Sequence, residues 1–247
     1  MVKWISHRGE SIDAPENTLD AFKLSLERNT DGMECDVRLT ADGKVVVSHD
    51  NTTLRTGNAN VNVETSTYEE LLKVRVYGAN EDNYPDAVIP LLSETFQYLG
   101  KDREYYIELK GVNPALVEAV KAEVEKSGVN PDQIVFISFS QEFIKAIKIA
   151  MPQCKALWLD GLVRSYGIVT PQELVAKLEE LGVDGIDASA HPETSAELIE
   201  AVHKAGKTYA VWTIDNPYQA EYFVKLGVDS ITSNRAGMIK EWAAKRA

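Results

Sequence analysis

The chain has few cysteines, few histidines and no long apolar run. Its 247 residues include two cysteines and four histidines, and nowhere do about 18 apolar residues follow one another, so no membrane-spanning helix is expected. Cys35 and Cys154 match no zinc or redox spacing, and Cys35 lies in an alternating apolar run that predicts a buried free thiol. A chain of this length can bury a large core without disulfides or structural metals.

Positive charge is also scarce. Lysine and arginine total 26 against 38 aspartates and glutamates, for a net charge of −12. This average field repels nucleic acid and anionic membranes, so we predict neither a nucleic-acid partner nor stable membrane association. A small anionic substrate remains compatible, because a local cation or a metal reverses the sign within a pocket. The amphipathic helical patterns leave the oligomeric state open.

The N-terminal segment Met1–Arg8 contains no apolar run typical of a signal peptide. This pattern predicts a cytoplasmic protein. A leader removed from a longer chain would leave the same pattern, so a periplasmic or secreted location stays open.

Short apolar runs alternate with longer segments of helical period, as in repeated βα units. Eight runs are predicted as parallel strands: Val2–His7, Met33–Leu39, Tyr105–Lys110, Ile134–Phe139, Ala156–Leu159, Gly185–Ala188, Tyr209–Ile214 and Ser230–Thr232. Helical patterns lie between them at Leu19–Arg28, Pro114–Ser127, Gln141–Met151, Pro171–Leu181, Thr194–Ala205 and Pro217–Leu226. The alternation predicts an α/β fold.

A ninth apolar run, Val45–Ser48, follows an Asp42-Gly43 turn and is predicted as the antiparallel arm of a β-hairpin. The eight remaining strands are the number that a TIM (β/α)8 barrel requires. An open doubly wound sheet is the competing fold, but no Gly-rich nucleotide loop follows the first strand. We therefore predict one barrel domain over residues 1–247, with a polar insertion at about residues 51–88 that helps to cover the site.

Three carboxylates are predicted to meet at the barrel mouth. Glu34 and Asp36 are two residues apart on one strand and point to the same side, and Glu108 and Lys110 repeat this spacing on the next parallel strand. Converging carboxylates resist simultaneous ionisation unless a cation compensates them. Oxygen ligands favour Mg²⁺ or Ca²⁺ as that cation. Ordinary ion pairs at the rim explain the spacing equally well.

Two histidines also stand at predicted strand ends. His7 and His49 could supply a general acid and a general base, although single histidines in such places are more often structural. Arg8 and Lys110 are candidate phosphate binders, with rim salt bridges as the alternative. Trp212 could form an apolar wall for a small alcohol, with core packing as the alternative.

Six motifs carry a resemblance to a known family. They are His7-Arg8-Gly9 with Pro15-Glu16-Asn17-Thr18 and Phe22; Glu34-Cys35-Asp36-Val37 with Thr40-Ala41-Asp42-Gly43 and Val46-Val47-Ser48-His49-Asp50; Ile107-Glu108-Leu109-Lys110; Ser138-Phe139; Val211-Trp212-Thr213-Ile214; and Gly227-Val228-Asp229-Ser230-Ile231-Thr232. Together they resemble the glycerophosphodiester phosphodiesterase family nearly end to end. The first two motifs are the most specific.

The resemblance implies a metal-dependent phosphodiesterase that hydrolyses glycerophosphodiesters, such as glycerophosphocholine or glycerophosphoethanolamine, to sn-glycerol 3-phosphate and an alcohol. It implies three groups of site residues: Glu34, Asp36 and Glu108 for the metal, His7 and His49 as the acid–base pair, and Arg8 and Lys110 for the phosphate with Asn17 in support. One divalent cation, Mg²⁺ or Ca²⁺, is the implied cofactor.

Two segments depart from the family pattern and leave the alcohol specificity open. The family commonly has Thr-Asp and then proline where this chain reads Thr232-Ser233-Asn234-Arg235-Ala236, and Ser189-Ala190-His191-Pro192 matches no motif. Three rival functions remain: a phospholipase D-like lysophospholipid phosphodiesterase, a non-catalytic phosphoryl-ligand binding protein, and a Schiff-base aldolase or lyase that uses Lys110.

Overall fold

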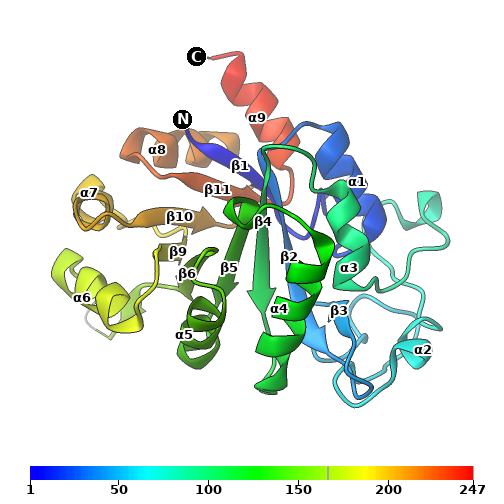
Figure 1. Cartoon of the computed structure of the whole chain (residues 1–247). Helices are drawn as coiled ribbons and strands as arrows, with labels where there is room; N and C mark the ends of the chain where they lie inside the picture. The colour runs from blue at the N-terminus through cyan, green and yellow to red at the C-terminus, as the bar shows by residue number, and fades with distance from the viewer. Residues whose placement is uncertain (166, 247) are drawn as a thin grey trace.

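The computed structural model describes residues 1–165 and 167–246, and its centre is a closed barrel of eight parallel strands (Figure 1). The barrel strands are β1 (Lys3–Ser6), β2 (Gly32–Leu39), β4 (Glu104–Leu109), β5 (Ile134–Ser138), β6 (Lys155–Asp160), β9 (Gly185–Ser189), β10 (Thr208–Trp212) and β11 (Ser230–Ser233). Their spatial order is β1-β11-β10-β9-β6-β5-β4-β2, and pairing of β1 with β2 closes the ring. The predicted TIM-type barrel and its eight parallel strands are confirmed.

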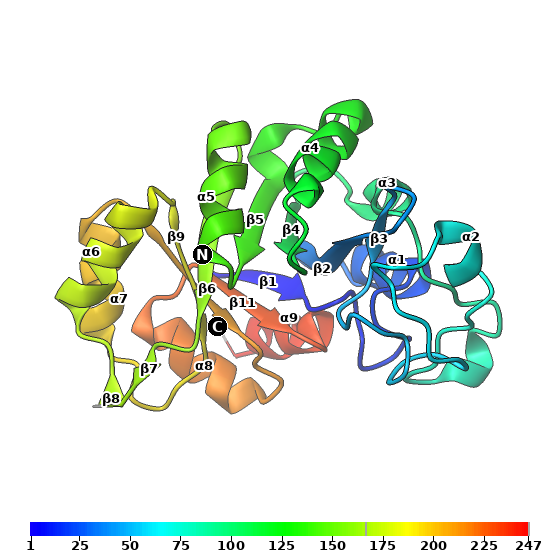
Figure 2. The same ribbon diagram turned by 90° about the horizontal axis from the view of Figure 1, so that it is seen from below.

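Helices surround the barrel (Figures 1 and 2). Those expected from the sequence are α1 (Leu19–Glu27), α4 (Ala115–Ser127), α5 (Gln141–Ala150), α6 (Pro171–Leu181), α7 (Ala196–Lys204) and α8 (Pro217–Leu226). The structure adds α9 (Ala236–Ala244), the short α2 (Tyr68–Leu71) and α3 (Leu92–Thr95), and the 3-10 turns η1 (Glu81–Asn83), η2 (Phe96–Tyr98) and η3 (Pro131–Gln133). None of the helices in the described residues is long and apolar enough to cross a membrane.

Two antiparallel hairpins depart from the parallel pattern. The first is the predicted one, in which β3 (Val45–Val47) pairs with the end of β2. The second, β7 (Val163–Arg164) with β8 (Gly167–Ile168), follows β6 and was not predicted. Residues 51–88 hold isolated β-bridges and α2, and they lie beside β3, away from α6 and α7 (Figures 1 and 2). The role of this segment as a cover stays a prediction.

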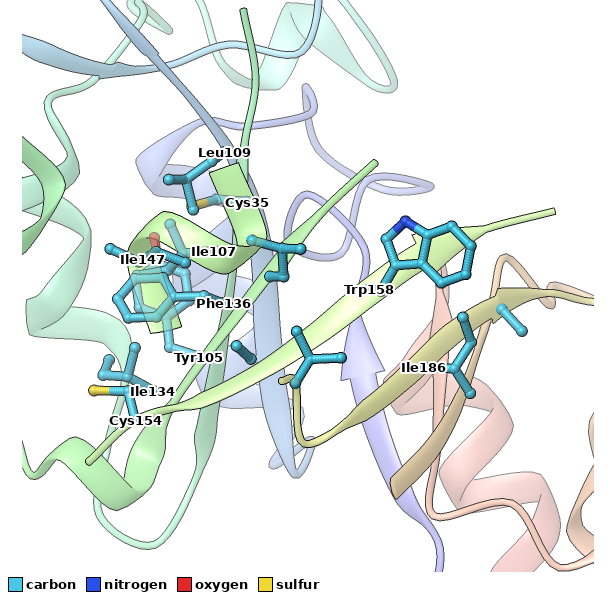
Figure 3. Close-up of a cluster of buried hydrophobic side chains, with 14 of the residues drawn as sticks. Cys35, Tyr105, Ile107, Leu109, Ile134, Phe136, Ile147, Cys154, Trp158 and Ile186 are labelled. Carbon is cyan, nitrogen blue, oxygen red and sulfur yellow. The ribbon is translucent and has the colours of Figure 1, made fainter. Parts of the chain in front are cut away.

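The largest apolar cluster lies between the outer face of the barrel and the helices. Outward-facing residues of neighbouring strands, among them Cys35, Tyr105 and Phe136, pack there against helical residues such as Ile147 (Figure 3). Cys35 and Cys154 are both buried free thiols, as expected for Cys35. A second cluster fills the barrel interior with Ile5, Tyr106, Val135, Ile137, Leu157, Leu159 and Ala210. The barrel is therefore a packed core, and its site is built on top of that core.

Phe136→Ala is expected to lower the free energy of unfolding by about 3–5 kcal/mol, because it leaves a cavity where a fully buried ring fills the space between strand and helix. Chemical denaturation monitored by circular dichroism measures the change. Ile149→Ala is the control on the neighbouring helix, since Ile149 is 80% exposed, and it should shift stability by no more than about 0.5 kcal/mol. Equal effects of the two changes would contradict this placement of the core.

Candidate active site

The inward-facing side chains at the carboxyl ends of the eight strands line one cavity of about 240 Å³. It is lined by His7, Arg8, Glu34, His49, Glu108, Lys110, Ile137, Phe139, Leu159, Asp187, Trp212, Thr213 and Thr232. The register of the parallel strands sets this arrangement, since bridge partners such as Asp36 and Glu108 point to the same side. Seven of the nine predicted site residues line the cavity, and the other two, Asp36 and Asn17, do not.

Glu34, Asp36 and Glu108 form the acidic group that was predicted at the barrel mouth. One side-chain oxygen from each lies within 4.8 Å of the others, and the three residues are buried. Asn17 lies behind them and donates from Nδ2 to Asp36 Oδ2 over 2.8 Å. The predicted supporting residue therefore contacts the acidic group and does not line the cavity.

Arg8 and Lys110 supply the positive charge beside these carboxylates. Arg8 Nε lies 3.3 Å from Asp36 Oδ2, and Lys110 Nζ lies 2.7 Å from Glu108 Oε1 and 3.4 Å from Asp36 Oδ1. The Arg8 backbone is left-handed, with φ of 56°, and its N–H donates to Glu34 Oε2 over 2.8 Å. Gly9 makes this turn possible, because a Cβ there would come within 2.6 Å of Ala21.

The donor set suits a hard divalent cation. Asp36 Oδ1 is buried and receives no hydrogen bond from the described residues, which leaves a carboxylate oxygen that can coordinate. The three residues of the group all offer carboxylate oxygens, and oxygen ligands of this kind favour Mg²⁺ or Ca²⁺ over softer metals. The buried acidic group is therefore compatible with a divalent metal site.

The pKa values of the three carboxyl groups are shifted in opposite directions by burial and by the neighbouring charges. Burial, together with the Asp36 charge, raises the pKa of Glu108 to about 8 and that of Glu34 well above its usual range. Burial opposes ionisation of Asp36 too, but Arg8 and Lys110 outweigh it and hold the pKa of Asp36 below its usual range. The positive charges of Arg8 and Lys110 therefore compensate part of the negative charge of the three carboxylates.

His7 is held by a chain of side-chain hydrogen bonds. Its Nδ1 lies 2.7 Å from Asn234 Oδ1, and Asn234 Nδ2 donates to Asp215 Oδ2 over 2.6 Å. Because the aspartate oxygen must accept, the amide oxygen of Asn234 faces His7, and His7 Nδ1 must carry the proton. Nε2 is left as the basic nitrogen. Burial, with the Arg8 charge adding to it, lowers the pKa of His7 to about 4.

His49 is backed by a carboxylate instead. Its Nδ1 lies 2.7 Å from Asp50 Oδ1, and Asp50 Oδ2 accepts a hydrogen bond from Arg55 Nε over 2.7 Å. Arg55 belongs to the segment 51–88 and also contacts Glu16, which pairs with Arg8. Burial lowers the pKa of His49, Arg8 and Lys110 add to this effect, and Asp36 opposes it.

The remaining wall combines aromatic and polar side chains, and Phe139, Asp187 and Thr232 in it were not assigned to the site by sequence analysis. Trp212 and the half-exposed Phe139 pack edge to face with ring centroids 5.6 Å apart. Asp187 and Thr232 lie in the cavity lining and are almost fully buried, at 1% and 2% exposure. A carboxylate inside the buried run Gly185–Ala188 was the available signal for Asp187, because acidic residues are rarely buried without a partner.

Comparison with known proteins gives consistent results. A model of the glycerophosphoryl diester phosphodiesterase family matches residues 7–238. A glycerophosphodiester phosphodiesterase of Caldanaerobacter subterraneus subsp. tengcongensis is 32% identical over 238 residues, which cover 93% of each chain. Another from Bacillus altitudinis is 28% identical, over 98% of this chain and 99% of the relative.

Solved structures agree on the fold. A glycerophosphodiester phosphodiesterase from Agrobacterium tumefaciens superposes with a TM-score of 0.80 at 28% identity, over 97% of this chain and 99% of that one. An Oleispira antarctica phosphodiesterase, solved in complex with the product sn-glycerol-3-phosphate, superposes with a TM-score of 0.87 at 23% identity, over 98% and 96% of the two chains.

His7 is expected to stay neutral, with its proton on Nδ1, down to about pH 5, because its folded-state pKa is about 4. Nitrogen NMR of selectively labelled histidine measures the titration. The lowered pKa also means that His7 contributes stability above its unfolded pKa near 6.5, and that this stability is lost as pH falls from there towards 4. A His7 titration midpoint above 6 would contradict the buried hydrogen-bonded ring.

Proposed function

The chain belongs to the glycerophosphoryl diester phosphodiesterase family and is a phosphoric diester hydrolase, and from this membership we propose that it hydrolyses glycerophosphodiesters to sn-glycerol 3-phosphate and an alcohol. Glycerophosphocholine and glycerophosphoethanolamine are the proposed substrates. The product bound to the Oleispira antarctica phosphodiesterase is consistent with this proposal. A cytoplasmic location remains a prediction from sequence.

One observation carries the proposal: a single cavity joins two histidines, two cations and an acidic group. A phosphodiester needs each of these. Its non-bridging oxygens carry negative charge that Arg8 and Lys110 can stabilise as it grows in the transition state. Its nucleophile must lose a proton and its leaving alkoxide must gain one, and two histidines in one cavity can carry both protons.

The hydrogen-bond partners of the two histidines indicate which one acts as the general base and which as the general acid. The amide of Asn234 fixes His7 as a neutral ring with a basic Nε2, which suits removal of a proton from the nucleophile. The Asp50 carboxylate behind His49 stabilises a protonated ring, which suits donation to the leaving oxygen. We propose His7 as the general base and His49 as the general acid.

The acidic group would hold the cofactor. A divalent cation bound by Glu34, Asp36 and Glu108 would supply Lewis acidity to the phosphate. Asn17 orients Asp36 through its 2.8 Å hydrogen bond. Trp212 would form an apolar surface beside the substrate, together with Phe139.

Incubation with glycerophosphocholine is expected to release sn-glycerol 3-phosphate, to stop when EDTA removes the cation, and to resume when Mg²⁺ or Ca²⁺ is restored. A coupled glycerol 3-phosphate dehydrogenase assay measures the product. Choline release from lysophosphatidylcholine, measured in parallel, separates this activity from lysophospholipid cleavage. No release from several glycerophosphodiesters with either metal would rule the proposal out.

His7→Ala and His49→Ala are each expected to lower kcat by about two to four orders of magnitude, because each removes one proton carrier. Both variants should keep the thermal unfolding midpoint of the parent protein within a few degrees. His203→Ala is a matched control, since His203 lies on helix α7 and pairs with Asp229 outside the cavity. Near-normal turnover of both cavity variants would refute the acid–base roles.

A further inference from the structure

The polar segment 51–88 contacts the site through an arginine that uses all three of its side-chain nitrogens. Arg55 Nε donates to Asp50 Oδ2 over 2.7 Å, and Arg55 Nη1 and Nη2 donate to the two carboxylate oxygens of Glu16, each over 2.8 Å. A single exposed ion pair contributes little, but a guanidinium that binds one carboxylate with two parallel hydrogen bonds also fixes its orientation. Arg55 therefore holds Asp50 and Glu16 in one arrangement.

Each of these carboxylates contacts a residue of the cavity. Asp50 Oδ1 lies 2.7 Å from His49 Nδ1, and Glu16 Oε1 accepts a hydrogen bond from Arg8 Nη1 over 2.8 Å. Arg55 thus connects the proposed general acid with a cation of the phosphate site, although one follows β3 and the other follows β1. The Arg55 side chain is 48% exposed and is not part of the lining of that cavity, so it acts through its two partners.

A second arginine holds the backbone of His49. Arg38 Nε and Nη2 donate to the His49 carbonyl oxygen over 3.1 Å and 2.7 Å, and Arg38 Nη1 donates to Glu64 Oε1 over 2.6 Å. Glu64 belongs to segment 51–88, and Gly111 leaves space for it, because a Cβ on Gly111 would collide with the Glu64 carboxylate. The segment therefore fixes His49 from two directions, at its ring nitrogen and at its carbonyl oxygen.

We propose that segment 51–88 positions the proposed general acid, with Arg55 and Glu64 as its positioning residues. This role rests on the proposed function and goes beyond that of a cover. A general acid must hold its nitrogen within hydrogen-bond reach of the leaving oxygen, so a His49 ring that is free to turn protonates that oxygen less often. Neither positioning residue needs to touch the substrate.

Attachment of the segment to the barrel is the other role open to these ion pairs. Apolar contacts already provide attachment, since Val63 and Leu71 pack with Val46 of β3 in one buried cluster. A backbone hydrogen bond adds to it, in which the Ala41 N–H donates to the Ser66 carbonyl oxygen over 2.9 Å. Loss of one partly exposed ion pair should therefore leave the segment in place and change the chemistry instead.

Two substrates with different leaving groups test the positioning role. Choline departs as an alkoxide that needs a proton, whereas p-nitrophenolate departs without one, so only the first reaction depends on the general acid. The compared substrates are glycerophosphocholine and the p-nitrophenyl diester of glycerol 3-phosphate, and the coupled assay measures glycerol 3-phosphate from both. Arg55→Ala and Glu64→Ala are each expected to raise the ratio of kcat for the p-nitrophenyl diester to kcat for glycerophosphocholine by about tenfold.

Two further arginine variants complete the comparison. Arg55→Lys keeps the positive charge but loses the two parallel hydrogen bonds, so its ratio should lie between those of the parent protein and Arg55→Ala. Arg75→Ala is the matched control in the same segment, because the Arg75 side chain contacts the Tyr77 ring and the Glu81 carbonyl oxygen. Its ratio should stay within about twofold of the parent value. Equal losses for the two substrates in Arg55→Ala and Glu64→Ala would overturn the positioning role.

NMR relaxation of labelled histidine rings tests the same role without turnover. The order parameter of the His49 ring is expected to fall in Arg55→Ala and Glu64→Ala, while that of His7, which Asn234 holds, should not change. An unchanged His49 order parameter would also overturn the proposal. If the parent protein releases glycerol 3-phosphate from neither substrate, the proposed function fails, and the NMR result alone then decides whether the segment positions His49.

Discussion

The register between β2 and β4 places the Asp36 and Glu108 carboxylates side by side, and Glu34 adds a third acid to the same buried space. Burying three acids together is unfavourable unless cations compensate them. Arg8 and Lys110 provide part of that compensation through short contacts with Asp36 and Glu108. Neighbouring groups also stabilise these charges. The left-handed backbone at Arg8 directs its N–H to Glu34, and the Asn17 amide donates a hydrogen bond to Asp36.

The same constraint explains how an acidic protein can bind an anionic substrate. A net charge of −12 repels phosphates at long range, but screening limits that field to about 8 Å at physiological ionic strength. Inside the cavity the local charges dominate, and the cations Arg8 and Lys110 lie in its lining. A divalent cation bound to the acidic group would make the electrostatic potential in the cavity more positive still, which favours an anionic substrate.

Rigid support for this site comes from the two faces of the barrel. Outward-facing residues such as Tyr105 and Phe136 join the strands to the helices, and inward-facing residues such as Tyr106 and Leu157 fill the interior beneath the cavity. The polar side chains therefore stand on strand ends whose positions are fixed by packing. A loop residue, Arg55, adds further support by forming ion pairs with both Asp50 and Glu16. Asp50 contacts His49, and Glu16 contacts Arg8.

Local patterns in the sequence were enough to predict the eight strands, the first hairpin and the convergence of Glu34, Asp36 and Glu108, because side-chain alternation and parallel pairing are short-range rules. Helix α9 was not predicted, and the roles assigned to the site residues stay proposals. Only the closed barrel shows that Asp187 and Thr232 line the cavity and that hydrogen bonds connect His7 through Asn234 to Asp215. Ring closure pairs β11 with β1 and places β9 opposite β2, although more than 140 residues of sequence separate β2 from β9. No local pattern encodes which side chains then meet or which are left without a partner.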